Sequence, residues 1–288
     1  MNTLNTANSS HTLLCSGRPV GRYTFSPTLA PHLSARPYLH PVSTLGGVAV
    51  TEEMPEDHVH HLGVGIAVPD VGGANFWGGR TYVRDQGSVE LDNHGSQVHR
   101  GWKLRDPDGF VEELSWRTGR DCSAELLREH RTVAATELDG VAWALDFTFS
   151  LTNTSGGDLS IGSPATNGRA GAGYGGFFWR APKQAAAPLA FTANGEGEEA
   201  VHGRTADWLG LAGQGWTLVF AGATAETRRD PWFVRTGEYP GVGSALAWAE
   251  RLPVPAGATV VRRLVTVVAD GVLDREASAA YISRAVGS

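Results

Sequence analysis

The chain has 288 residues, of which 41% are hydrophobic, so it can bury a full core, and all-β chains of this length often form one domain. Its formal net charge is −6, and its 24 Lys and Arg residues are dispersed along the sequence. No basic cluster that could follow a phosphate backbone is visible, which argues against nucleic acid as a partner.

The N-terminal residues are polar, without the basic start and apolar run of a targeting segment. We expect residues 1–15 to be a disordered tail and residues 16–288 to be a single β-sandwich domain. No apolar stretch reaches the roughly 18 residues that a membrane helix needs. The sequence therefore predicts a soluble cytoplasmic protein with no membrane partner. Cys15 and Cys122 match no metal-ligand spacing and are expected to be unpaired.

In chain order, the first half reads as short strands separated by turns, in a sequence with 37 glycines. Apolar and polar residues alternate with a period of two, which is typical of strands with one buried face. Turn sequences such as D-P-D-G and L-D-G separate several of these segments. The predicted strands are Pro19–Ser26, Arg36–Pro41, Gly47–Thr51, Gly95–Arg105, Gly109–Arg117, Ala124–Ala134 and Val141–Thr152.

The second half continues the pattern and ends in the only helix that we predict, Leu273–Ala285, which follows a D-G boundary and contains good helix formers. Its predicted strands are Trp208–Leu211, Gly215–Ala221, Ala245–Leu252 and Thr259–Val268. About fifteen short strands in one unit favour two large packed sheets over a small barrel. The predicted fold class is all-β, a large antiparallel two-sheet sandwich with a short C-terminal helix.

The densest group of titratable residues lies in Pro55–Trp77, where Asp57, His58, His60 and His61 occupy five positions. In an extended segment His58 and His60 would point to one side, and Asp57 and His61 to the other. We expect His58 and His60 to act together as general acid and base, with His61 a less certain member. His58 and His60 are also the pair that would bind a divalent metal ion. The structural alternative is a solvated turn.

Two further residues are candidates for acid–base chemistry. His99 lies on a predicted strand, where it is either part of the site or a structural histidine. Glu238, in the segment Asp230–Gly241, would be the second carboxylate of an acid–base pair, and a surface charge is the alternative. On the strand Ala124–Ala134, Glu129 and Arg131 flank a histidine, a pattern that suggests cross-strand ion pairs.

A Gly-rich aromatic segment, Gly173–Pro182, is a candidate for substrate binding. Tyr174, Trp179 and Arg180 combine ring faces with a planar donor, which suits a sugar ring, while buried core aromatics are the alternative. Asn167 and Arg169 precede this segment and are expected to reach the same cleft. Trp77 and Trp232 lie in Gly- or Pro-flanked loops and are the preferred sugar platforms among nine tryptophans.

One hairpin-like passage resembles a known group of sugar enzymes. In Leu145–Gly162, four apolar residues alternate onto one face, Asn153–Gly157 turns the chain, and Leu159 and Ile161 return. This strand, Asn-Thr turn and returning strand resemble the middle of galactose-mutarotase-like β-sandwiches. In those enzymes a catalytic histidine follows, whereas residues 163–173 contain none here.

A second resemblance covers residues 36–269 and is carried by five ordered motifs: RPYLHPV (Arg36–Val42), DHVHHLGVG (Asp57–Gly65), DVGGANFWG (Asp70–Gly78), LREHRT (Leu127–Thr132) and GYGGFFWRAP (Gly173–Pro182). They resemble the PmoA-like, or methane-oxygenase-like, family of soluble bacterial proteins. The resemblance implies a large β-sandwich of the galactose-mutarotase-like supersandwich type, often met beside carbohydrate-utilisation functions. This chain has Val59 and Leu62 where the commoner form has Pro and Arg.

Together these patterns suggest an enzyme that acts on a carbohydrate, either a sugar or an oxidised keto-glycoside, by histidine-mediated elimination or hydrolysis. The expected partners are a small glycoside and a sugar oxidoreductase that oxidises a ring carbon in the same pathway. No Gly-rich phosphate loop is present, so no nucleotide cofactor is expected, and a divalent metal ion is allowed but not required. The alternatives are a non-catalytic carbohydrate-binding sandwich and an aldose epimerase or mutarotase.

Overall fold

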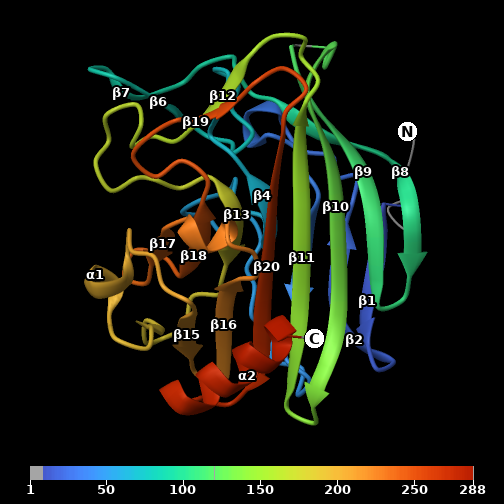
Figure 1. The fold of residues 1–288 in the computed structure, drawn as a ribbon, viewed down its shortest axis with the longest axis vertical. Helices are drawn as coiled ribbons and strands as arrows, with labels where there is room; N and C mark the ends of the chain where they lie inside the picture. Colours follow the sequence, from blue (N-terminus) through green and yellow to red (C-terminus); the bar gives the residue numbers. More distant parts are fainter. Residues whose placement is uncertain (1–8, 120, 288) are drawn as a thin grey trace.

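Two large antiparallel sheets pack face to face and form the body of the protein (Figure 1). In this computed structural model, residues 9–119 and 121–287 are described. The seven-stranded sheet has the order β1 (Ser10–Cys15), β2 (Arg18–Thr24), β3 (Tyr38–Val42), β4 (Val64–Ala67), β13 (Gly176–Arg180), β18 (Gly241–Ala245) and β17 (Trp232–Arg235). The eight-stranded sheet has the order β14 (Leu189–Phe191), β15 (Leu209–Gly213), β16 (Trp216–Gly222), β20 (Thr259–Asp270), β11 (Ala142–Asn153), β10 (Ala124–Asp139), β9 (Gly109–Thr118) and β8 (Ser96–Asp106).

Smaller elements complete the fold. A three-stranded sheet contains β19 (Leu252–Val254), β12 (Leu159–Gly162) and β5 (Asp70–Val71), and a hairpin is formed by β6 (Thr81–Val83) and β7 (Gly87–Val89). The helices are α1 (Glu198–Val201), α2 (Arg275–Gly287) and two short 3₁₀ turns, η2 (Pro31–Leu33) and η3 (Thr227–Arg229). Of these elements, β6, β7, β12 and β19 lie at one end of the sandwich and α2 lies at the other (Figure 1). No helix in the described part of the chain is long and apolar enough to cross a membrane.

The predicted fold class is confirmed: the protein is mostly β, with antiparallel sheets and a short C-terminal helix. Helix α2 begins after Asp274, whose carboxylate accepts a hydrogen bond from the backbone N–H of Ala277 and so caps the first turn. Ile282 and Ala285 pack α2 against Val219 and Val267 on the outer face of the eight-stranded sheet. Figure 1 shows α2 at the lower end of the eight-stranded sheet, near β16 and β20, where it covers apolar residues that would otherwise face solvent.

Several predicted elements differ from the structure. The tail was expected to extend to residue 15, but Ser10–Cys15 forms β1 against β2; residues 1–8 lie outside the described part of the chain. Residues 47–51 contain only an isolated bridge at Ala49, and residues 246–251 are a loop between β18 and β19. Both segments have apolar residues that pack without pairing in a ladder.

The predicted hairpin at Leu145–Gly162 is also wrong. Asn153 makes the expected turn, with its side-chain oxygen accepting from the Ser155 backbone N–H. Its amide group, however, donates to the carbonyl oxygen of Val254 in β19 at 2.7 Å. This contact directs the chain out of the large sheet, and β12 pairs with β19 and β5 while β11 pairs with β10 and β20.

A buried polar network joins the two sheets. Every second residue of β10 faces the core, and two of those residues, Glu129 and Arg131, are charged and fully buried. The Arg131 guanidinium donates to Glu129 at 2.7 Å and 3.0 Å, to the Tyr23 hydroxyl at 3.0 Å and to the Gln97 side chain at 3.0 Å. The Trp116 indole also donates to the Oε2 atom of Glu129 at 2.7 Å. Glu129 and Arg131, which were expected to pair across strands, therefore form an ion pair within β10, and both side chains point into the core.

Replacing Arg131 should test how much this network contributes. Arg131→Met would leave the Glu129 carboxylate buried without its counter-ion, and we expect a loss of about 3–5 kcal/mol in the free energy of unfolding. Chemical denaturation followed by tryptophan fluorescence measures the change. Arg128→Met, on the exposed face of the same strand, is the matched control and should cost less than about 0.5 kcal/mol. Equal unfolding midpoints for the two variants would contradict the role given to the network.

Candidate functional site

The histidine segment connects β3 to β4 and folds as two consecutive turns. The backbone N–H of His58 donates to the Pro55 carbonyl at 3.0 Å, and that of His61 donates to the His58 carbonyl at 2.9 Å. The predicted alternation of side chains is therefore wrong, because it assumed an extended segment. Instead, the turns bring all three imidazoles and Asp57 to one cavity.

Two glycines permit this close packing. Gly63 has a φ of +55°, and a Cβ atom there would lie 2.2 Å from the Leu39 carbonyl oxygen of β3. Gly78 has a φ of +97°, and a Cβ atom there would lie 2.9 Å from the His60 Cβ atom. Larger residues at either position would separate the histidine turns from the strands behind them.

The three imidazole rings touch one another. The rings of His58 and His61 are stacked with centroids 4.6 Å apart, and the His60 ring meets His61 edge to face at 4.8 Å. Tyr239 contacts both His58 at 4.6 Å and His61 at 5.0 Å, and Trp77 contacts His61 at 5.7 Å. His61, the member that was least certain from sequence, lies at the centre of the cluster and is only 1% exposed.

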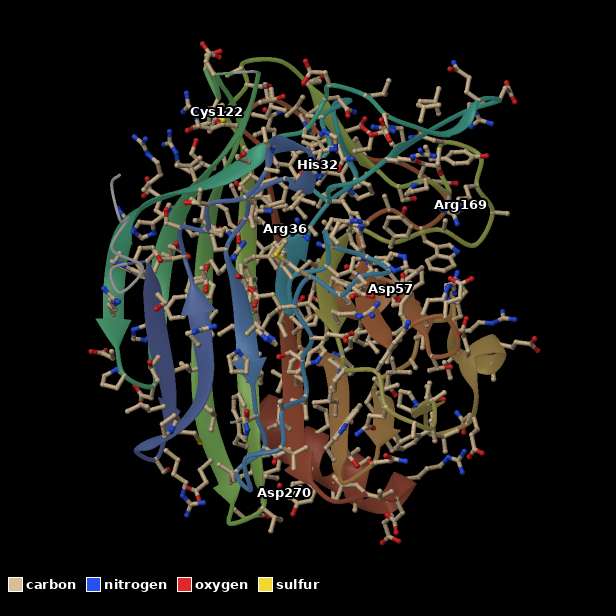
Figure 2. The ribbon with its side chains drawn as sticks, turned by 180° about the vertical axis from the view of Figure 1, so that it is seen from behind. His32, Arg36, Asp57, Cys122, Arg169 and Asp270 are labelled. Atoms are coloured by element: carbon tan, nitrogen blue, oxygen red, sulfur yellow. The ribbon has the colours of Figure 1, made fainter. Side chains whose placement is uncertain are left out.

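The cavity measures about 420 Å³ and lies beside the seven-stranded sheet, where Figure 2 shows Asp57 and Arg169 on neighbouring loops. Its lining combines acid–base groups with aromatic rings and arginines. Of the predicted site residues, it brings together Asp57, His58, His60, His61, Trp77, Arg169, Tyr174 and Glu238. These residues come from four separate loops of the chain.

Besides Arg180, four predicted site residues do not line the cavity. His99, on β8, holds its Nδ1 atom 2.5 Å from Glu112 within the buried network. The Asn167 side chain donates to Asp70, which pairs with Arg251. The indole N–H groups of Trp179 and Trp232 donate to backbone carbonyls, and both rings belong to the core between the sheets. Burying the apolar surface of Trp179 and Trp232 in the core stabilises the folded state, so these two rings are core residues and not sugar platforms.

Arg180 was predicted to bind substrate, but its side chain is fully buried behind the cavity. Its guanidinium donates to Glu52 at 2.9 Å, to Asp57 at 3.3 Å and to the Nδ1 atom of His61 at 3.4 Å. It also lies 4.7 Å from the Tyr239 ring centroid. Arg180 therefore positions the groups that line the cavity.

The contact with Arg180 sets the tautomer of His61. A guanidinium can only donate, so the His61 Nδ1 atom accepts, and the neutral ring carries its proton on Nε2. Among the described residues this Nε2 atom has no hydrogen-bond partner, and it is not sealed from the cavity. Burial lowers the pKa of His61 far below its usual range, and the neighbouring His60, His58 and Arg180 lower it further. His61 is a neutral hydrogen-bond donor.

The pKa values of His60 and Asp57 are also shifted by their surroundings. Burial lowers the pKa of His60 to about 3, assisted by the positive charges of Arg36 and Arg180. Burial alone would raise the pKa of Asp57, but the hydrogen bond from Lys183 and the charge of Arg180 bring it down to about 2. At neutral pH the cavity therefore holds a neutral His60 and an ionised Asp57.

His58 and Asp57 form a candidate pair for proton transfer. The His58 Nδ1 atom lies 3.5 Å from the nearer Asp57 carboxylate oxygen and is buried without a hydrogen bond. A proton on Nδ1 would face this carboxylate, which leaves Nε2 unprotonated and able to accept a proton. In the part of the chain that the structure describes, no group of three His, Cys, Asp or Glu residues is arranged to hold a metal ion.

Sequence reasoning missed several residues of the cavity. Phe233, Tyr239 and Arg80 line it together with the predicted Glu238 and its neighbour Arg235. The density of aromatic and charged residues in residues 230–241 was the available signal. Arg36 was also missed, although it belongs to a motif that carried the family resemblance.

Comparison with known proteins identifies the family and leaves its function open. Residues 10–283 match DUF6807, described as a family of unknown function, so the chain belongs to this family. No curated protein is significantly similar in sequence. The resemblance to PmoA-like proteins, drawn from motifs, stays a prediction.

Two solved structures align with parts of this chain at low identity. The galactosidase domain of the α-galactosidase–sucrose kinase AgaSK aligns with 78% of this chain at 8% identity and a TM-score of 0.36. A heparinase III gene product aligns with 65% of this chain at 11% identity and a TM-score of 0.25. This chain spans 32% and 23% of those two chains. Neither likeness assigns an activity.

The lowered pKa of His60 predicts a pH dependence of stability. Unfolded His60 would bind a proton below its ordinary pKa of 6.5, whereas folded His60 stays neutral down to a pKa of about 3. The stability that this neutral ring contributes is full above pH 6.5 and is lost as the pH falls toward 3. The loss has a slope of up to about 1.4 kcal/mol per pH unit.

Denaturant unfolding at a series of pH values between these limits measures this slope. His60→Gln removes the titrating group and should flatten the dependence by up to that amount. If the stability of His60→Gln decreased as steeply as that of the wild type when the pH is lowered from 6.5 to 3, His60 would not be held neutral in the folded protein.

Proposed function

We propose that the protein is a carbohydrate-active enzyme that cleaves a glycoside, native or keto-oxidised, by acid–base elimination or hydrolysis. One observation carries the proposal: three imidazoles and an ionised carboxylate share a cavity of about 420 Å³ with aromatic rings and arginines. This volume lies within the range of about 300–1,000 Å³ that is usual for small-molecule sites. Perturbed titratable groups in a cavity are typical of catalytic sites.

Aromatic side chains support a sugar as the ligand. Trp77 and Tyr174 pack at 4.6 Å, and Tyr174 and Phe233 at 5.4 Å, so the rings form a continuous apolar wall. Sugar rings bind to such walls through their C–H faces, while their hydroxyl groups need planar donors and acceptors nearby. Arg169 and Glu238 line the same cavity and supply a donor and an acceptor.

His58 is the residue to which we assign the general base. Asp57 stands beside its Nδ1 atom and would stabilise the imidazolium that forms when Nε2 takes a proton. This assignment revises the pairing of His58 with His60. His60, with a pKa of about 3, is a weak base and better suited to hydrogen bonding.

His61 is the residue to which we assign stabilisation of negative charge. Its Nε2–H group, fixed by the contact of Nδ1 with Arg180, is a donor that does not have to reorient during the reaction. Tyr239 packs against both His58 and His61, and burial raises the pKa of its hydroxyl, so the hydroxyl keeps its proton at neutral pH. It is the candidate for protonating the leaving group.

In the elimination, His58 would remove a ring proton made acidic by a neighbouring carbonyl group. The electron pair forms a ring double bond, the bond to the leaving oxygen breaks, and that oxygen takes a proton from Tyr239. A partner sugar dehydrogenase would supply the carbonyl group in a keto-glycoside. No nucleotide cofactor is consumed in this step, and a divalent cation remains optional.

Mass spectrometry of products tests the proposal directly. The purified protein would be incubated with a panel of native and 3-keto glycosides, with and without a chelator. We expect a product with the mass of an eliminated or hydrolysed sugar, because a bond to the leaving oxygen breaks. Interconversion of anomers without a new mass would instead indicate a mutarotase.

Replacement of the base separates catalysis from binding. His58→Ala should lower kcat by about 10²–10⁴-fold while sugar affinity changes little, because the imidazole acts mainly in the transition state. His130→Ala, which removes an exposed imidazole on the outer face of β10, is the matched control and should retain activity. Unaltered turnover in His58→Ala would exclude His58 as the base. If the wild type and both variants bound sugar and none of them turned it over, the protein would be a non-catalytic carbohydrate-binding protein.

A further inference from the structure

We propose that the substrate is a sugar acid, whose carboxylate is bound by arginines of the cavity, and that the reaction is β-elimination from a uronoside. This inference rests on the proposed function and narrows its substrate class. It is carried by a buried arginine without a counter-ion under the cavity and by two arginines on one of its walls.

Arg36 is the buried arginine. Its side chain is only 4% exposed, and its guanidinium donates to three carbonyl oxygens, those of Leu33, Ser34 and His60, the last at 2.6 Å. Within residues 9–119 and 121–287, no carboxylate forms an ion pair with it. A buried cation without a counter-ion is costly, so its retention calls for a compensating charge.

The positive charge of Arg36 acts on the histidines that line the cavity. It donates to the backbone of His60, and together with Arg180 it lowers the pKa of both His60 and His61. Arg180 has its own partners in Glu52 and Asp57, whereas Arg36 has none of that kind among the described residues. An anion bound above His60 would therefore be attracted by a charge that is screened little by solvent.

Two further arginines border the Tyr174–Phe233 wall. The Arg235 guanidinium lies 4.8 Å from the Phe233 ring centroid and is held there by Glu198 at 3.2 Å. Burial raises the pKa of the Tyr174 hydroxyl, and the nearby charge of Arg169 opposes that rise. In the described part of the chain Arg169 has no ion pair with a carboxylate. These two planar donors suit a carboxylate placed against this wall.

A uronoside fits these features and the proposed chemistry. Its C5 proton lies next to the carboxylate, so neutralising that carboxylate with arginines makes the proton more acidic. His58 would take the C5 proton, the C4–C5 double bond forms, and the bond from C4 to the linked oxygen breaks. That oxygen leaves with a proton from Tyr239. No oxidant, reductant or water is consumed, so this substrate needs no prior oxidation.

The test compares two ligands that differ only at C6, where one has a carboxylate and the other a hydroxymethyl group. Isothermal titration calorimetry with methyl β-D-glucuronide and methyl β-D-glucoside should give at least about tenfold tighter binding of the glucuronide, and the preference should shrink in high salt. Arg169→Gln and Arg235→Gln should each reduce that preference. Arg204→Gln, an exposed arginine that lines a separate cavity of about 440 Å³, is the matched control and should keep it.

A second measurement follows the reaction. With 4-linked oligoglucuronate or oligogalacturonate, ultraviolet absorbance should rise as the conjugated C4–C5 double bond forms, and His58→Ala should abolish the rise. Equal affinity for the two methyl glycosides would overturn the inference, while turnover of neutral or keto glycosides would leave the proposed function intact. Neither binding nor turnover of any glycoside, charged or neutral, would overturn both.

Discussion

The buried guanidinium of Arg180 is the contact on which the candidate site depends. It reaches Glu52, Asp57 and His61 from the end of β13 and packs over Tyr239, so one side chain fixes groups from two separate loops, the β3–β4 and β17–β18 connections. Because the arginine is sealed from solvent, its hydrogen bonds are not exchanged for bonds to water. The two histidine turns, which have no regular secondary structure of their own, are thereby held in one arrangement.

The sandwich determines where this contact can form. β13 pairs with β4 on one side and β18 on the other, and the loops that precede or follow these three strands carry the histidine turns, Tyr174 and Tyr239. The Glu129–Arg131 network lies between the sheets and away from the cavity, and it ties β10 to β2. One buried arginine thus joins the sheets, and another organises the site. The rigid sheets hold loops that would otherwise be mobile.

Much of the fold could be predicted from the sequence, because long strands such as β10 and β11 alternate apolar and polar residues over many positions. Short elements could not be predicted. The position of β12, for example, depends on one hydrogen bond from the Asn153 side-chain amide to the Val254 carbonyl oxygen, which directs the chain away from the sheet that contains β11. The composition of the site was visible in the histidine segment. Its geometry was not, because the positive φ of Gly63 and the hydrogen bonds of the turns give that segment a shape without periodicity. Trp179 and Arg180 are adjacent in sequence, yet one is core and the other organises the site.

The central claim is that His58, His60 and His61 form one sugar-binding site with Trp77. Nitrogen NMR of the imidazole and indole groups during titration with methyl β-D-glucuronide tests it most directly. If they share one site, the resonances of these three histidines and of the Trp77 indole will shift together and saturate at one ligand concentration, while those of His99 and Trp179 stay fixed. Shifts confined to His99 or to other histidines, with the cluster unchanged at saturation, would contradict it.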